Sequence, residues 1–375
     1  MNERIPMSAP EIDESDVAAV VEVIRSGRLS LGPKTEEFEE AIRDYVGVRH
    51  AVAVSSGTAA LHLIVRALGL GPGDEVLVPS FTFAASVNAL LYEGIKPVFC
   101  DIEDETYNLN PSDIEKKITP KTKAIMVVDV FGHPADWEAI TRIATEHDLR
   151  IIDDSCEALG AEYDGRKIGQ FGDAAAFAFY ANKQITTGEG GMIVTNNSEI
   201  AGIARSLRNQ GRSEMGSWLE HERLGFNYRM DEMSAALGLS QLRRIELFLT
   251  RRQQVADVYA QRLRCVPCVR IPVVSPRVRM SWFVYVVALD KAIDRSTVIE
   301  YLKKRHIPVR CYFSPIHLQN YMRLCVSCGS GELPTTVSIA RRTLALPFHN
   351  LLTTSQVDEV ADALQEAVEG VLSER

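Results

Sequence analysis

Short apolar runs alternate with helical segments along the first half of this 375-residue chain. The pattern predicts strands at residues 51–54, 75–78, 97–100, 124–128 and 149–152, with a helix between each pair. Strands separated by helices pair in parallel, and their apolar sequences indicate a sheet that helices cover on both faces. We therefore expect a mostly parallel sheet, with functional groups at the carboxyl ends of its strands.

The pattern changes near residue 250. A long helix is expected at residues 250–263, followed by a proline-containing stretch and an apolar run at 283–289. The length of the chain suits more than one domain at about 150 residues each. We predict a large domain over residues 1–250 and a smaller α+β domain over residues 251–375, packed together because no long polar linker separates them.

Two helices are expected before the first strand. The first should end at Gly27, and the second should follow Pro33. Apolar residues at helical spacing predict the buried face of the first helix: Val17, Val20, Val21 and Ile24.

The charge and the N-terminal residues exclude several functions. A net charge of −9 argues against sequence-independent binding of nucleic acid or of an anionic membrane surface. No apolar run approaches the ~20 residues that a membrane helix needs. The first residues lack the apolar core of a secretory signal, so a cytoplasmic location is expected.

The seven cysteines form an odd number, which argues against a disulfide framework in a cytoplasmic protein. Two Cys-x-x-Cys pairs, at 265–268 and 325–328, could together supply a four-cysteine zinc site. The gap between the pairs is far longer than in compact zinc ribbons. Separate thiols and no metal are therefore the favoured expectation, and a zinc site stays open as the alternative.

Lysine is scarce, which makes Lys183 conspicuous. Only 11 of the 41 basic residues are lysines, and none lies between Lys183 and Lys291. Lys183 follows the apolar run 174–180 and precedes a glycine-rich turn. A lysine at the end of a buried strand is costly unless a partner or a covalent bond uses its amine. It is either a Schiff-base amine or a side chain that reaches solvent.

Two further groups would suit a pyridoxal phosphate site. Ser56, Gly57 and Thr58 form a strand-to-helix turn, where free N–H groups and the helix dipole favour an anion. Asp153 and Asp154 end a predicted strand, where a carboxylate could hold the pyridine nitrogen protonated. Taken singly, the turn also fits an ordinary helix cap, and the acid also fits a cap or a Mg²⁺ ligand.

Order and context make these features specific. The chain carries five ordered segments at 54–61 (VSSGTAAL), 79–85 (PSFTFAA), 152–160 (IDDSCEALG), 177–191 (FAFYANKQITTGEGG) and 225–230 (GFNYRM). With shorter matches at 309–317 and 345–347, they resemble the DegT/DnrJ/StrS family of pyridoxal phosphate-dependent sugar aminotransferases over nearly the full length. The resemblance implies an α/β fold of the aspartate aminotransferase-like type (fold-type I), with a smaller C-terminal α+β domain.

The resemblance also implies roles at matched positions. Lys183 would hold the Schiff base and, once the amino donor frees it, would move the proton between substrate and cofactor. Asp154 would keep the pyridine nitrogen protonated. Phe83 would stack on the cofactor ring, unless it is a core phenylalanine. Gly57 and Thr58 would bind the phosphate.

Further positions are implied around the cofactor and the substrate. Glu157 stands where the family often has His or Gln near the cofactor, with a solvated helix acid as its alternative. Asn227 would reach the phosphate of the neighbouring subunit, which implies a homodimer with its active site at the interface. The substrate side would include Tyr312, His317 and Arg229, although a structural role is equally open for the first two.

Two positions bear on the reaction. Family members commonly carry a serine five residues before the lysine, and here that residue is Ala178, so phosphate contacts must come from elsewhere, with Asn182 as the candidate. Members that act as dehydratases replace the lysine with histidine, whereas this chain keeps Lys183, which favours transamination.

The leading hypothesis is a cytoplasmic enzyme that moves an amino group from L-glutamate to a nucleotide-linked keto-deoxysugar for amino-sugar and polysaccharide biosynthesis. Residues 180–191 resemble perosamine-synthase-like members, which favours a 4-keto-6-deoxy sugar. Amination at C3, a lyase, dehydratase or amino-acid aminotransferase reaction with the same cofactor, and a non-catalytic regulator are the alternatives. The sequence does not identify the nucleotide, the sugar or any assembly beyond a dimer.

Overall fold

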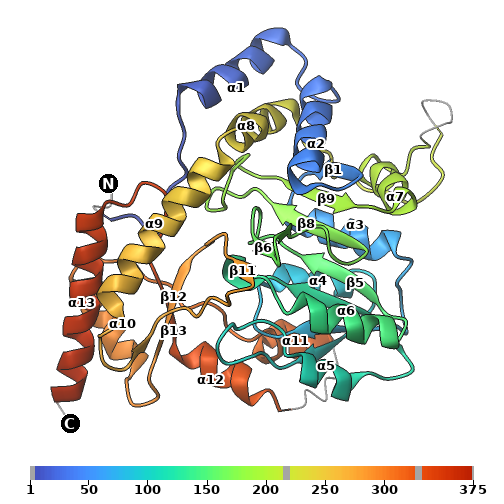
Figure 1. Ribbon diagram of the computed structural model, residues 1–375. Helices are drawn as coiled ribbons and strands as arrows, with labels where there is room; N and C mark the ends of the chain where they lie inside the picture. Colours follow the sequence, from blue (N-terminus) through green and yellow to red (C-terminus); the bar gives the residue numbers. More distant parts are fainter. Residues whose placement is uncertain (1–4, 214–219, 326–331, 374–375) are drawn as a thin grey trace.

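A seven-stranded sheet forms the centre of the computed structural model, which describes residues 5–213, 220–325 and 332–373 (Figure 1). Its strands are β1 (His50–Val54), β2 (Glu75–Pro79), β3 (Lys96–Cys100), β4 (Thr122–Val128), β5 (Arg150–Asp154), β8 (Ala174–Ala178) and β9 (Gly191–Thr195). The order is β1–β9–β8–β5–β4–β2–β3. Strands β8, β5, β4, β2 and β3 pair in parallel, and β9 runs antiparallel to both β8 and β1. The predicted mostly parallel sheet is therefore confirmed.

Helices cover both faces of this sheet. They are α2 (Pro33–Val46), α3 (Gly57–Ala67), α4 (Ala84–Leu91), α5 (Pro111–Lys117), α6 (Trp137–Glu146), α7 (Ser198–Arg208), α8 (Glu232–Leu242) and α9 (Ile245–Leu263). Helix α1 (Glu14–Ser26) packs against α8 instead. Helices α3, α4 and α7 share a core with one face. On the other face, α2, α8 and α9 pack near β1, and α5 and α6 pack near β4. Within the described residues, no helix is both long and apolar enough to cross a membrane.

The C-terminal residues build a second, antiparallel sheet. It contains β10 (Val269–Arg270), β12 (Tyr285–Leu289) and β13 (Thr343–Leu346). Around it lie α10 (Arg295–Lys304), α12 (Pro334–Arg342) and α13 (Thr354–Ser373), whereas α11 (Asn320–Cys325) joins the core that α3 and α4 share with the central sheet. A small third sheet joins β11 (Val278–Arg279) to β6 (Glu162–Tyr163) and β7 (Arg166–Lys167). Helix α9 runs from α8 to α13 without a break at residue 250, and the domain boundary placed there stays a prediction (Figure 1).

The predicted buried face of α1 is wrong for the isolated chain. The helix ends as expected, with Gly27 in the left-handed conformation at its cap. Val17 and Ile24, however, are 47% and 54% exposed. Asp16 is buried instead, where it forms an ion pair with Arg244 and accepts a hydrogen bond from Gln241. The polar Asp16 thus takes a buried position on this helix, while Val17 and Ile24 of the predicted stripe are left exposed.

Asp101 joins the end of β3 to the start of α12. Its Oδ1 accepts hydrogen bonds of 2.7 Å from both the backbone N–H and the hydroxyl of Thr336, and its Oδ2 accepts one of 3.0 Å from the N–H of Thr335. Leu333, at the N-cap of α12, offers no side-chain acceptor. Asp101 therefore caps this helix from a distant part of the sequence. Burial alone would raise the pKa of Asp101, but the hydrogen bonds outweigh it and lower the pKa.

We expect Asp101→Asn to lower the free energy of unfolding by about 1–3 kcal/mol at neutral pH, because an amide cannot accept all three hydrogen bonds. The lowered pKa means that the stabilisation by wild-type Asp101 is present above its unfolded-state pKa and is lost as the pH falls through its folded-state pKa. The difference between the two proteins should therefore shrink below about pH 4. Urea unfolding at neutral and acidic pH measures it, and a difference independent of pH would contradict this account.

Candidate active site

The carboxyl ends of β1, β2, β4, β5 and β8 meet at one edge of the sheet, as their common direction requires. A cavity of about 380 Å³ opens there. Eight of the predicted site residues line it: Gly57, Thr58, Phe83, Asp154, Glu157, Asn182, Lys183 and Tyr312. Parallel strands thus gather segments that are far apart in the sequence.

The turn after β1 forms one wall of the cavity. Ser56 caps α3, and its hydroxyl accepts a 3.1 Å hydrogen bond from the N–H of Ala59. A Cβ added to Gly57 would lie 2.7 Å from the Cβ of Ala178 and 2.8 Å from the Sγ of Cys156. The turn therefore packs too closely for a side chain at residue 57. The first N–H groups of α3 have no acceptors within the helix, and such groups favour an anion.

Asp154 ends β5 inside the cavity. Its Oδ2 accepts a 2.6 Å hydrogen bond from the Ser86 hydroxyl, and its Oδ1 accepts a 3.3 Å bond from the N–H of Cys156. Both bonds stabilise the carboxylate in one orientation. Asp153 does not line the cavity, because successive side chains of a strand point to opposite faces. Asp154 is thus the acid that the site can use.

Lys183 is enclosed rather than directed to solvent. Its amine lies 3.7 Å from the Oε1 of Glu157 and 3.9 Å from the centre of the Phe283 ring, and its side chain is 12% exposed. Glu157 is buried too, which excludes a solvated helix acid, and its Oε2 accepts a 2.9 Å hydrogen bond from the N–H of Phe131. Burial raises the pKa of Glu157, although Lys183 opposes the shift.

The remaining groups fit pyridoxal phosphate. Phe83 is 64% exposed at the cavity, which excludes a core position and leaves its ring free to stack on a flat ligand. The Oδ1 of Asn182 is buried without a hydrogen-bond partner among the described residues, so its amide can serve a ligand. A primary amine, a fixed carboxylate and a helix N-terminus are the three groups that this cofactor requires.

Three predicted residues lie outside the cavity in the isolated chain. Asn227 is exposed. Arg229 lines a separate hollow and donates a 2.9 Å hydrogen bond to the Oδ1 of Asn209. The buried ring of His317 shares a 2.6 Å hydrogen bond between its Nδ1 and the hydroxyl of Ser80, and burial lowers its pKa. Their assignment to cofactor or substrate stays a prediction.

The expectation of no metal stays a prediction for both cysteine pairs. Cys265 is exposed and Cys268 is half-buried. The second pair falls outside the residues whose side chains are described. Within the described part of the chain, no group of three or more His, Cys, Asp or Glu side chains could hold a metal ion.

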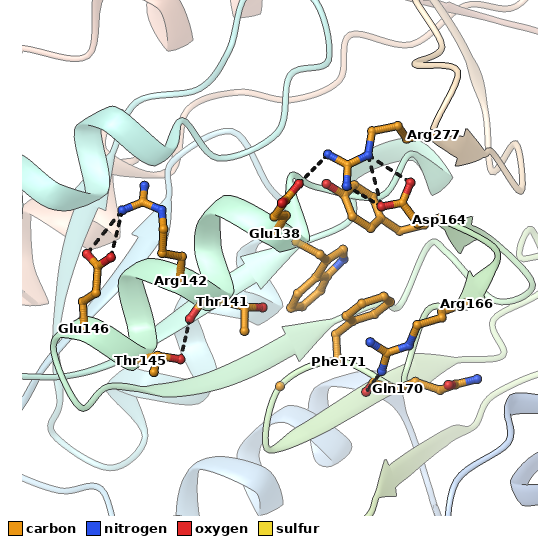
Figure 2. Close-up of a pocket in the computed structure, with 13 residues that line it drawn as sticks. Glu138, Thr141, Arg142, Thr145, Glu146, Asp164, Arg166, Gln170, Phe171 and Arg277 are labelled. Atoms are coloured by element: carbon orange, nitrogen blue, oxygen red, sulfur yellow. Dashed lines mark hydrogen bonds and ion pairs between the residues drawn. The ribbon is translucent and has the colours of Figure 1, made fainter.

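A larger hollow of about 710 Å³ lies beside α6 and contains none of the predicted site residues (Figure 2). Two of its three arginines have acidic partners nearby. Arg277 pairs with Asp164 and lies 2.7 Å from Glu138, and Arg142 lies 3.2 Å from Glu146. The charges of Arg277 and Arg142 are thus neutralised, and the third arginine, Arg166, packs on the Phe171 ring and donates a 3.3 Å hydrogen bond to the carbonyl of Gln170.

Sequence reasoning missed several residues of the site, among them Ser86 and Phe283. Ser86 could have been found. It lies in the first turn of α4, three residues after Phe83 at the N-cap, and residues three apart lie on the same side of a helix. Phe283 could not, because it lies 100 residues after Lys183 in an apolar run that reads as an ordinary buried strand.

The sequence model of the DegT/DnrJ/EryC1/StrS aminotransferase family matches residues 10–365. The chain belongs to this family. It is 40% identical to the GDP-perosamine synthase of Caulobacter vibrioides, over 97% of this chain and 98% of that protein. It is 37% identical to the spore coat polysaccharide biosynthesis protein SpsC of Bacillus subtilis, over 98% of each chain.

Solved structures agree with this assignment. DesV of S. venezuelae, solved with a ketimine intermediate, matches with a TM-score of 0.90 and 36% identity over 96% of this chain and 99% of its own. DesI, solved with its TDP-sugar product, matches with a TM-score of 0.91 and 33% identity over 100% of this chain and 95% of its own. The PLP form of Spr1654 from Streptococcus pneumoniae matches with a TM-score of 0.92 and 29% identity over 98% of this chain and 99% of its own. The predicted fold-type I architecture, aminotransferase activity and pyridoxal phosphate cofactor are thereby confirmed.

We expect Gly57→Ala to weaken pyridoxal phosphate binding and to cost about 1–3 kcal/mol of stability, because the added methyl group overpacks the turn. Cofactor titration of the apoprotein and thermal unfolding measure the two effects. Gly202→Ala is the matched control, since nothing lies within 4 Å of the added Cβ in α7. Unchanged cofactor affinity in Gly57→Ala would show that the turn does not hold the phosphate.

Proposed function

We propose that this aminotransferase moves the amino group of L-glutamate to the keto carbon of a nucleotide-linked 4-keto-6-deoxy sugar, in the cytoplasm. The observation that carries the proposal is the enclosed amine of Lys183, which shares one cavity with Asp154 and the Gly57 turn. Similarity to proteins named GDP-perosamine synthase and to DesI with a TDP-sugar supports the substrate class. The product would serve amino-sugar and polysaccharide biosynthesis.

The residues of the cavity divide the chemistry among them. Bound pyridoxal phosphate supplies an electron sink for the charge that develops at the carbon bearing the amino group. Asp154, fixed by Ser86, would hold a proton on the ring nitrogen. Lys183 would remove the proton from one carbon and return it at another. Phe283 covers the lysine amine and would keep water from it.

The partner subunit would complete this site. Asn227 is exposed and lies outside the cavity of its own chain, which suits a residue that serves a neighbour. Large apolar side chains are exposed on and after α1, which supports a homodimer interface in this region: Val17, Ile24, Leu29 and Leu31.

A screen of GDP-, UDP- and dTDP-linked keto-deoxysugars with L-glutamate tests the substrate. We expect mass spectrometry to show an amino-sugar nucleotide from a 4-keto-6-deoxy substrate, and no product from Lys183→Ala. Wild-type turnover in that variant would contradict the mechanism. Turnover of simple 2-oxo acids alone would contradict the substrate class.

Mixing two inactive variants tests the shared site. We expect Lys183→Ala and Asn227→Ala each to lose activity, and an equimolar mixture that has exchanged subunits to regain up to about a quarter of wild-type activity, because half of the dimers then hold one intact site. If Asn227 serves its own chain instead, mixing gives no gain. Mixed and unmixed samples at equal protein concentration provide the comparison.

A further inference from the structure

Arg252 is a buried cation that the mechanism above does not use. It lies in α9, the helix that runs from α8 to the C-terminal helices (Figure 1), and it is 3% exposed. No carboxylate among the described residues forms an ion pair with it, and its Nε has no hydrogen-bond partner there. Burying an unpaired guanidinium is costly, so the hydrogen bonds that hold it there need an explanation.

The guanidinium donates its hydrogen bonds to backbone carbonyls from two separate segments. Its Nη1 lies 2.9 Å from the carbonyl oxygen of Trp282 and 3.2 Å from that of Phe283. Its Nη2 lies 3.1 Å from the carbonyl oxygen of Lys183. The planar fork of an arginine can join such acceptors in one fixed geometry, whereas a lysine ammonium cannot.

The segment on the far side of this clamp is strained. Trp282 has a φ of 54°, in the left-handed region that a bulky residue rarely adopts. Its indole N–H donates a 2.8 Å hydrogen bond to the Oε1 of Gln253, the neighbour of Arg252 on α9. Two consecutive residues of one helix therefore hold Trp282 in this conformation. Strain of this kind persists only where surrounding contacts impose it.

The strained turn determines where Phe283 lies. The Phe283 ring is 3.9 Å from the Lys183 amine, and its backbone N–H donates a 3.0 Å hydrogen bond to the carbonyl of Phe131. The N–H of Phe131 in turn holds Glu157, the other group beside the amine. Arg252 thus donates hydrogen bonds to the backbone of both Lys183 and Phe283. These are the two residues whose side chains meet in the contact between amine and ring.

We propose that Arg252 is a positioning residue that fixes the Lys183 amine for condensation with the cofactor aldehyde. The proposal rests on the assignment of Lys183 in the proposed function. In that step the amine nitrogen and the aldehyde carbon form a C=N bond, and the carbonyl oxygen leaves as water. Arg252 acts through the backbone of Lys183 and Phe283 and does not touch the reacting atoms.

Two forms of the cofactor separate positioning from general damage to the pocket. Pyridoxal phosphate can form the bond to Lys183, whereas pyridoxamine phosphate has no aldehyde and cannot. Both use the same phosphate and ring contacts. The ratio of their dissociation constants, measured on the apoprotein, therefore reports how well the amine is placed, independently of any sugar substrate.

The test compares Arg252→Met and Arg252→Lys with wild type. Because a reacting group displaced by about 1 Å can lose about 100-fold, we expect Arg252→Met to reduce the preference for pyridoxal phosphate by roughly tenfold. Pyridoxamine phosphate affinity should stay close to that of wild type. Arg252→Lys keeps the charge but not the fork, and it should also lose preference. If Arg252→Met does not fold, the Arg252→Lys ratio decides.

Arg251→Met is the matched control, because Arg251 neighbours Arg252 on α9 but pairs with Glu11 outside the cavity. Equal losses for both cofactor forms, or a wild-type ratio in the folded Arg252 variants, would overturn the proposal. Lys183→Ala gives the ratio of dissociation constants expected when the C=N bond to the cofactor cannot form at all. If Lys183→Ala leaves the wild-type ratio unchanged, the assignment of Lys183 fails, which is a different result from a failure at Arg252.

Discussion

The amine of Lys183 is enclosed by groups from separate parts of the chain, and the site depends on their being held at fixed places. Glu157 follows β5, Lys183 lies in the turn after β8, and Phe283 comes shortly before β12. Burying an amine away from water costs free energy, and neighbours held at fixed positions are needed to offset that cost. Parallel pairing of β5 with β8 brings the first two together, and the contacts of α9 add the third.

The edge where this site forms was predictable because parallel strands end on the same side. Lys183, Asp154 and the Gly57 turn each follow an apolar run, so the strand pattern alone placed them at one edge. The sequence offered both Asp153 and Asp154, and strand alternation in the structure selects Asp154. Roles at these positions came from the family resemblance, since a lysine after a strand has several physical explanations.

Other features lay beyond the sequence because distant segments decide them. The antiparallel direction of β9 depends on a turn after Lys183 that returns the chain between β8 and β1. The stripe on α1 has helical spacing, yet Asp16 is buried against α8 while Val17 and Ile24 are exposed. Periodicity reports that an element has an apolar face, but it does not say whether the same chain covers that face.

The charged side chains around the cavity are placed to support the proposed transfer of an amino group. Burial and the nearby Asp129 raise the pKa of Asp153, whereas the Asp154 carboxylate accepts hydrogen bonds from Ser86 and from the N–H of Cys156. Arg252 places an unpaired positive charge behind the Lys183 backbone. Burial also raises the pKa of Glu157, and the nearby Lys183 amine opposes that shift. A carboxylate thus lies where the ring nitrogen needs a proton, and the Arg252 cation is held on the backbone side of Lys183 rather than in the cavity.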